Sequence, residues 1–439
     1  MNALERILDE FDAQAARATQ CAPSAARRAA AQALRTQGLP TRRDENWHYA
    51  NLRALEGVGQ FGTVAQPAAD AAAAVTLPPL PEPLHGYSRL LIVDGRLWAG
   101  SPWPSDPGIA RMPFEESVAA EPAAPFAISG DGRLGLVARL FAPEPLALRL
   151  RGMVSLEIIS VTSSSAAGCY TDLLLNIAAG AQVALVERRL TAPLPSGAAM
   201  ATAAPAAAID AHNLRLQLER GASLVHSRLQ QTADHVAQQD TLAAIVGESA
   251  SYRLHQVTAG GASARSSVQV QLAGRNAAFQ LRALAAARGT QVADAQFTVL
   301  HEAPGTKSDQ LFRGIASDRA HVSCSADVQV AATAPGAHVQ QSLRGLIDGK
   351  GAEMNLRPRL TINTDEIQAT HGATTGRLDE NLLFYLLARG LDDAAARSLL
   401  KWAFLGEALG ALDPPALRRV AGLAAAAQLS DAPALELLQ

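Results

Sequence analysis

The pattern of hydrophobic and polar positions changes twice along the chain, and the first part is helical. Between Leu4 and Phe11, apolar residues fall at helical spacing on one face. Ser24 can cap a second, Ala- and Arg-rich helix that ends at Gly38. Further along, an apolar run followed by Asp94-Gly95 is typical of a hairpin. We therefore expect residues 1–145 to form a mainly helical domain with a small β-hairpin.

From residue 146 the pattern changes to short apolar or alternating runs, separated by small polar turns. Such runs predict β-strands, and a Gly-containing motif recurs at several strand starts, as at Gly180 and Gly221. Because no helical stretch interrupts these strands, a doubly wound α/β sheet is excluded. A sandwich, a propeller and a β-solenoid remain open. The 4% content of aromatic residues favours the solenoid, because small side chains fit its narrow interior best. We expect this β core over residues 146–376.

The last part of the chain returns to a helical pattern. Asp379 can start a leucine-rich helix that ends at Gly390, and Asp392 can cap the next one. A third helix is expected from Pro415. Residues 377–439 are therefore predicted to form a C-terminal helical domain.

Composition and charge exclude several classes of protein. The 439 residues include 38 Lys and Arg against 41 Asp and Glu, so there is no global electrostatic footprint for nucleic acid. Cys21, Cys169 and Cys324 are far apart, which indicates neither a disulfide framework nor a zinc site. The N-terminus carries acidic residues, and no run of about 18 apolar residues occurs. We expect a cytoplasmic protein that binds neither membrane nor nucleic acid.

Two local features invite a chemical interpretation that their context does not favour. His301 and Glu302 are neighbours at a predicted strand end, but adjacent residues on a strand face opposite ways. A polar pair at a turn is the favoured interpretation. Cys324 lies on an apparent strand, where a lone cysteine is usually a small core residue.

The most informative stretch lies at the junction between the β region and the C-terminal helices. His371 has Gly372 on one side and threonines nearby, so its ring can approach a partner surface with little hindrance. A neutral imidazole is a ligand suited to iron. By residue type alone, however, a lone histidine is more often structural.

Several motifs resemble one known family. The run 370–380, followed by 383–391, closely resembles the C-terminal signature of the SufB/SufD family, whose members are subunits of the SUF iron–sulfur cluster assembly machine. The segments 301–308 and 351–355 fit the same family. Residues 40–49 look like a "P-T-x-x-x-E-x-W-x-Y" segment of the SufD type.

Within that family the residues favour the SufD type over the SufB type. SufB-type chains usually carry His-Glu-Ala-Thr where this chain has His371-Gly372-Ala373-Thr374, and they present a cysteine before the final turns. The corresponding run 340–343 contains no cysteine. SufD-type chains often have a cysteine two residues before the signature histidine, and here that residue is Ala369. No ligand role can therefore be carried over to that position.

The resemblance implies a right-handed parallel β-helix between helical domains and a non-catalytic scaffold role. It implies pairing with SufB through the β-helix and docking of the ABC-type ATPase SufC through the C-terminal helices. No tightly bound cofactor is expected; transient iron or a nascent cluster would meet His371 at the SufB interface, and a reduced flavin in the complex stays open. Aromatic and arginine side chains are typical interface anchors. The SufC-docking candidates are Phe384, Tyr385, Arg389, Arg397, Trp402 and Phe404.

Two alternatives remain beside this interpretation. The first is a SufB-like protein or a homodimeric scaffold, with a homodimer forming when SufB is absent, because strand edges can pair either way. The second is a β-helix enzyme acting on polysaccharides. Such enzymes are mostly exported and need paired carboxylates, whereas this β region contains few acidic residues.

Overall fold

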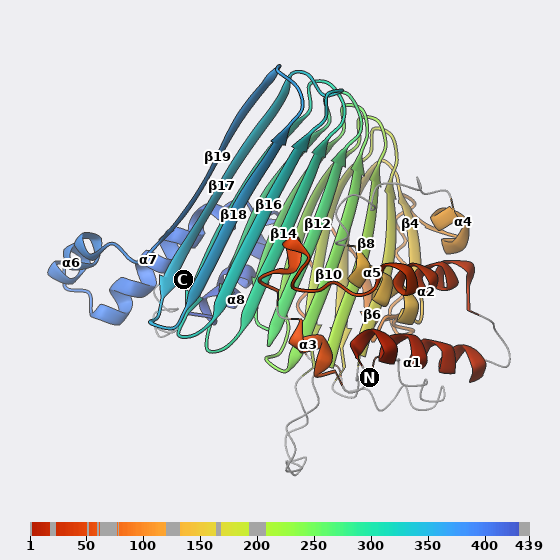
Figure 1. Ribbon diagram of the computed structural model, residues 1–439, viewed down its shortest axis with the longest axis horizontal. Coiled ribbons are helices and arrows are strands. Elements are labelled where there is room, and N and C mark those ends of the chain that lie inside the picture. The colour runs from red at the N-terminus through yellow and green to blue at the C-terminus, as the bar shows by residue number, and fades with distance from the viewer. Residues whose placement is uncertain are drawn as a thin grey trace, which may run out of the picture.

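The protein is a β-solenoid with helices packed against its outer faces. The computed structural model describes residues 2–17, 23–50, 52–58, 61, 77, 79–119, 132–163, 168–192 and 208–429. Its strands form two mainly parallel sheets that face each other over about seven turns (Figure 1). From β4 onward, successive strands alternate between the sheets, so each strand pairs with the strand two places along the chain. The parallel solenoid that the sequence predicts is confirmed.

The larger sheet has ten strands in the order β19-β17-β15-β13-β11-β9-β7-β5-β1-β2. These strands are β1 (Ser88–Val93), β2 (Arg96–Leu97), β5 (Met153–Thr162), β7 (Gln182–Thr191), β9 (Ser223–Gln231), β11 (Ser251–Ala259), β13 (Ala278–Ala287), β15 (Lys307–Ser317), β17 (Ala337–Asp348) and β19 (Ile367–Gly376). The smaller sheet has nine strands in the order β18-β16-β14-β12-β10-β8-β6-β4-β3. These strands are β3 (Ile109–Met112), β4 (Leu146–Leu150), β6 (Gly168–Ile177), β8 (Ala208–Leu218), β10 (Val236–Val246), β12 (Ser263–Leu272), β14 (Val292–His301), β16 (His321–Val330) and β18 (Glu353–Ile362).

The expected hairpin is formed by β1 and β2, which pair antiparallel. Asp94 and Gly95 between them have φ angles of 49° and 80°, which is typical of the tight turns that join such strands. However, β1 also pairs in parallel with β5, so the hairpin is the first part of the ten-stranded sheet. The sequence pattern identified the turn but gave no sign of this long-range pairing.

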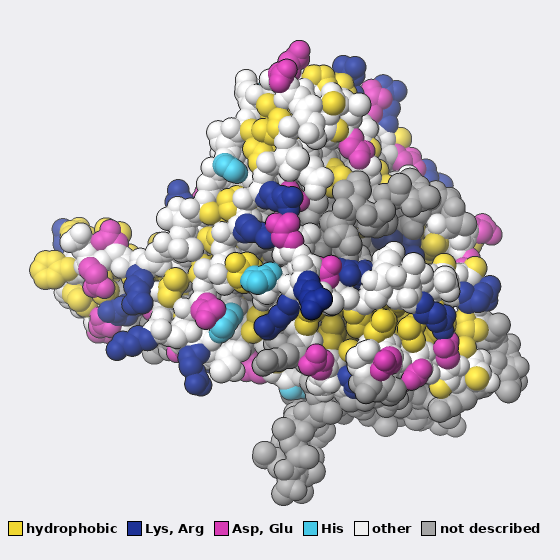
Figure 2. All heavy atoms as spheres, viewed as in Figure 1, with side chains coloured by type: hydrophobic (Ala, Val, Ile, Leu, Met, Phe, Trp, Pro, Cys, Tyr) yellow, Lys and Arg dark blue, Asp and Glu magenta, His cyan; other side chains and the backbone are white. Residues whose placement is uncertain are grey.

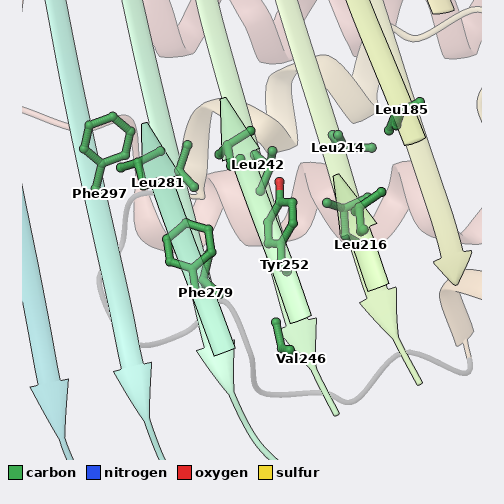
Figure 3. Close-up of a cluster of buried hydrophobic side chains, with 14 of the residues drawn as sticks. Leu185, Leu214, Leu216, Leu242, Val246, Tyr252, Phe279, Leu281 and Phe297 are labelled. Carbon is green, nitrogen blue, oxygen red and sulfur yellow. The ribbon is translucent and has the colours of Figure 1, made fainter. Parts of the chain in front are cut away.

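The solenoid interior contains aromatic rings as well as small residues (Figure 3). The rings of Tyr252 and Phe279 are 5.3 Å apart between centroids, and those of Phe297 and Phe312 are 6.5 Å apart. All four side chains are buried. The low aromatic content led us to expect that small residues would fill the interior, and this holds only in part. Alanines in the same cluster, such as Ala283, leave room for the few rings.

Helices cover the outer faces of both sheets (Figure 1). On the nine-stranded sheet, α5 (Arg133–Phe141) packs on β6, β8 and β10, with α1 (Ala3–Arg17) and α2 (Ala25–Gln37) beyond it. Near the other end, α7 (Asp393–Leu409) packs on β13 and β15, and α8 (Pro415–Ala426) packs on β11. The remaining helices are η1 (Glu45–Trp47), α3 (Arg53–Glu56), α4 (Phe114–Ala119) and α6 (Glu380–Ala388).

The helix starts predicted from capping residues are confirmed. The Ser24 side chain accepts a hydrogen bond from the Arg27 backbone N–H at the start of α2. Asp379 and Asp392 accept corresponding bonds at the starts of α6 and α7. Each cap satisfies backbone donors that the helix itself leaves unpaired.

Candidate functional site

The last turn of the solenoid ends without a neighbouring strand among the described residues. β19 pairs only with β17, and β18 pairs only with β16. Every residue from His371 to Gly376 is exposed, and Ile362 at the end of β18 is 42% exposed. Leu356 and Leu360 are only partly buried where the hydrophobic core reaches this end. An unpaired, partly apolar strand edge invites a partner. We call β18 and β19 the open end.

His371 lies on the inward face of the open end. It is opposite Gln341 of β17, which is opposite Gln310 of β15, and both glutamines are buried in the interior. Residues opposite each other in parallel strands share a face, so the imidazole of His371 is directed over the end of the core. Ala369, two residues earlier, shares this face and packs partly against the core. The structure therefore places the signature histidine where a partner that covers the open end would meet it.

The six docking candidates fall into two groups. On α6, the side chains of Phe384 and Tyr385 are 72% and 53% exposed, and Figure 2 shows hydrophobic side chains gathered on the arm that this helix forms. Arg389, the residue after α6, lies over the Tyr385 ring at 4.9 Å, and Arg397, near the start of α7, binds Asp393 at 2.7 Å. These four candidates remain accessible in the described structure.

The other two candidates, Trp402 and Phe404, lie on α7 and are partly buried. Both belong to the apolar cluster between the C-terminal helices and the ten-stranded sheet. The Trp402 ring lies so close to Gly422 of α8 that a Cβ atom at that glycine would come within 2.4 Å of it. Their contacts with the chain's own helices indicate a packing role for these two rings.

The residues 40–49 lie on the outer face of the nine-stranded sheet. Trp47 is buried, with the Arg265 guanidinium 3.9 Å above its ring. Glu45 binds Arg359 at 2.8 Å and Arg357 at 3.2 Å, and both arginines belong to β18. This N-terminal segment therefore reaches the open end from the outside.

The two features that the sequence disfavoured are structural. His301 is buried, with its two ring nitrogens 2.8 Å from the hydroxyls of Thr306 and Ser308. Burial lowers the pKa of His301 to about 4, so the ring is neutral at pH 7. Glu302 instead accepts a hydrogen bond from Gln271. Cys324 is a buried core residue whose pKa is raised by burial, which confirms its predicted role.

The sequence gave no sign of a charged cluster inside the early turns. The Glu187 carboxylate lies 2.7 Å from Arg228, 2.8 Å from His226 and 3.2 Å from His212, and Arg228 also binds Asp240 at 2.6 Å. Burial raises the pKa of Glu187, but Arg228 and His212 more than offset this, and the pKa lies well below its ordinary value. These residues are far apart in sequence, so only the register of the strands brings them together. Within the described ranges, no group of three His, Cys, Asp or Glu is arranged to hold a metal.

Comparison with known families agrees with this geometry. A family model described as "SUF system FeS cluster assembly, SufBD core domain" matches residues 160–404. The chain belongs to the SufBD family. The matched range covers most of the solenoid, β18, β19, α6 and part of α7, so the family core includes the open end.

Two curated relatives match over most of their length, and a third matches over less than half. The Escherichia coli protein named iron–sulfur cluster assembly protein SufD is 29% identical over 399 residues, 88% of each chain. A Synechocystis protein named as an iron–sulfur cluster assembly SufBD family protein is 27% identical over 398 residues, 87% of this chain and 86% of the relative. A chloroplastic protein of Arabidopsis thaliana is 30% identical over 200 residues, 45% of this chain and 42% of the relative. The SufD-like character that the motifs suggested is thus supported along the chain.

Among the described residues, no helix is both long enough and apolar enough to span a bilayer.

Proposed function

We propose that this SufBD family protein is a non-catalytic SufD-type scaffold that pairs with SufB through the open end and docks the ATPase SufC through α6. The cytoplasm is its expected compartment. Iron or a nascent iron–sulfur cluster would be handled transiently at the SufB interface as cargo. The observation that carries the proposal is the coincidence of the open end with His371, the signature histidine, on its inward face.

The chemistry of the open end supports a shared site. His371 offers one imidazole, whereas iron–sulfur clusters are normally held by several thiolates. The two described cysteines, Cys169 and Cys324, are buried in the interior. Other ligands would therefore come from the partner, and His371 would add one nitrogen donor from this side.

The exposed side chains of α6 support a second docking surface. Four apolar side chains of this nine-residue helix are exposed, namely Leu382, Phe384, Tyr385 and Leu387. A group of exposed apolar side chains is typical of an interface, because burying them against a partner removes apolar surface from water. Arg389 and Arg397 at the rim would fix the orientation of the partner.

Co-expression with SufB and SufC from the same host tests both surfaces. Affinity purification with light scattering should give one copy of this chain, one of SufB and two of SufC. Phe384→Ser should weaken SufC binding about tenfold or more, as loss of a hot-spot ring does, and should leave SufB bound. Leu423→Ser is the matched control, since Leu423 is 44% exposed on α8, away from α6.

Other results of the same purification would contradict the proposal in defined ways. A tight homodimer that excludes SufB would favour the homodimeric scaffold, because two copies of the open end could pair by twofold symmetry. A monomer without SufC would contradict the docking role of α6.

A further inference from the structure

Two glutamines lie directly behind His371 in the solenoid interior. His371, Gln341 and Gln310 occupy opposite positions in three neighbouring strands of the ten-stranded sheet. Gln341 is 3% exposed and Gln310 is 1% exposed. Deeper in the same row, the next two positions are Leu281 and Leu254. The next position in this row is the buried His226, so the row is not apolar throughout, but its last three strands carry three consecutive polar residues and end at the exposed histidine.

The amides of the two glutamines are incompletely paired. The Gln341 side-chain nitrogen donates to the backbone carbonyl of Ala326 at 3.2 Å, but its oxygen has no hydrogen-bond partner. Neither the oxygen nor the nitrogen of the Gln310 amide has one. A buried polar atom without a partner destabilises a protein, so two such amides in an apolar interior call for an explanation.

The position of His371 supplies that explanation. Neighbouring strands are about 4.8 Å apart, so the side chains of residues opposite each other on one face come within reach. The nitrogen of Gln341 is already engaged with Ala326, which leaves its oxygen as the free acceptor. A neutral imidazole has one N–H to donate and one nitrogen with a lone pair.

We propose that Gln341 is a positioning residue for His371. When the exposed His371 side chain turns towards the core, the Gln341 amide oxygen, which the structure leaves without a partner, accepts the N–H of the imidazole; this selects one neutral tautomer and directs the other nitrogen away from the core. The use of the free nitrogen as a ligand rests on the proposed function, whereas the hydrogen bond itself does not.

The hydrogen bond can be tested on the full-length chain without any partner. Long-range nitrogen NMR on ¹⁵N-histidine-labelled protein reports the tautomer of each ring, and His371→Ala assigns the signal. Gln341→Leu should shift the tautomer ratio of His371 by about fivefold, as expected for a typical neutral hydrogen bond.

Gln340→Leu is the matched control, because Gln340 is the next residue of β17 and is exposed on the outer face. It should leave the ratio unchanged. Equal ratios in the wild type and Gln341→Leu, with both folded by circular dichroism, would overturn the proposal.

An anaerobic Fe²⁺ titration of the complex with SufB and SufC separates the two proposals. If His371 is a ligand, His371→Ala should remove one site, and Gln341→Leu should weaken it about tenfold or more, as loss of an outer partner of a ligating histidine does. Loss of binding in His371→Ala with full binding in Gln341→Leu would overturn the positioning role alone. Unchanged binding in His371→Ala, with the tautomer shift present in Gln341→Leu, would overturn the ligand role and support the hydrogen bond.

Discussion

The early turns and the last turns of the solenoid differ in how their polar interior residues are paired. In the early turns, Glu187, Arg228 and Asp240 are buried and bind one another. In the last turns, Gln310 and Gln341 are equally buried, but their amides are incompletely paired and lead to an exposed histidine. Buried polar residues of one solenoid can thus either bind one another or keep donors and acceptors that are available to a partner.

The largest effect is expected from breaking the early cluster. Arg228→Met leaves the buried carboxylates of Glu187 and Asp240 without their shared cation, and should lower the free energy of unfolding by about 3–5 kcal/mol. Urea unfolding monitored by circular dichroism measures it. Arg220→Met is the matched control, because Arg220 binds Glu248 on the exposed surface, where a pair contributes about 0–1 kcal/mol. Equal losses in the two variants would contradict the assignment of stability to the early turns.

A smaller, pH-dependent effect is expected from His301. The pKa of His301 is about 4 in the folded protein, whereas the ordinary value for histidine is 6.5. The unfolded chain therefore binds the additional proton, so folded-state stability is full above pH 6.5 and is lost as the pH falls towards 4. The slope from this residue is about 1.4 kcal/mol per pH unit.

Replacing His301 should remove that part of the slope. Unfolding free energies measured between pH 6.5 and 4.5 should fall less steeply in His301→Gln than in the wild type. His338→Gln is the control, because His338 is exposed on β17. Parallel curves for the wild type and His301→Gln would show that His301 is not the residue responsible.

The smallest effect on stability is expected at the outer face of the open end. Glu45→Gln breaks the ion pairs with Arg357 and Arg359, whose side chains are 31% and 46% exposed. Exposed pairs contribute little, so the midpoint of urea unfolding should correspond to a loss of at most about 1 kcal/mol. A loss as large as that of Arg228→Met would mean that the N-terminal segment is essential for the stability of the last turn.

Much of the fold could be predicted from local signals. The caps Ser24, Asp379 and Asp392 act through neighbouring backbone groups, so a few residues of sequence contain the whole interaction. The strands could be predicted for the same reason. The pairing of β1 with β5 could not be predicted, because residues 94–152 lie between the two strands in the sequence. The domain boundaries at residues 145 and 376 stay predictions.

The candidate site shows the same division. The motif around His371 identified the family, but the placement of His371 on the inward side of the sheet depends on the register of β17 and β19. The exposure of Phe384 and the partial burial of Trp402 also required the tertiary structure, because both are aromatic residues on adjacent helices. The roles of His371 and of the docking residues stay predictions, and the binding of a reduced flavin in the complex stays open.

The C-terminal helices fold back over turns that were formed much earlier in the chain. Although they follow β19 in sequence, α7 packs on β13 and β15, and α8 packs on β11. A fragment that stops at residue 376 would therefore retain the open end but uncover apolar residues such as Val257 and Ile315 on another face. Such a fragment would expose two surfaces that can self-associate, the open end and the uncovered apolar face. Its self-association would therefore say little about the pairing of the intact protein.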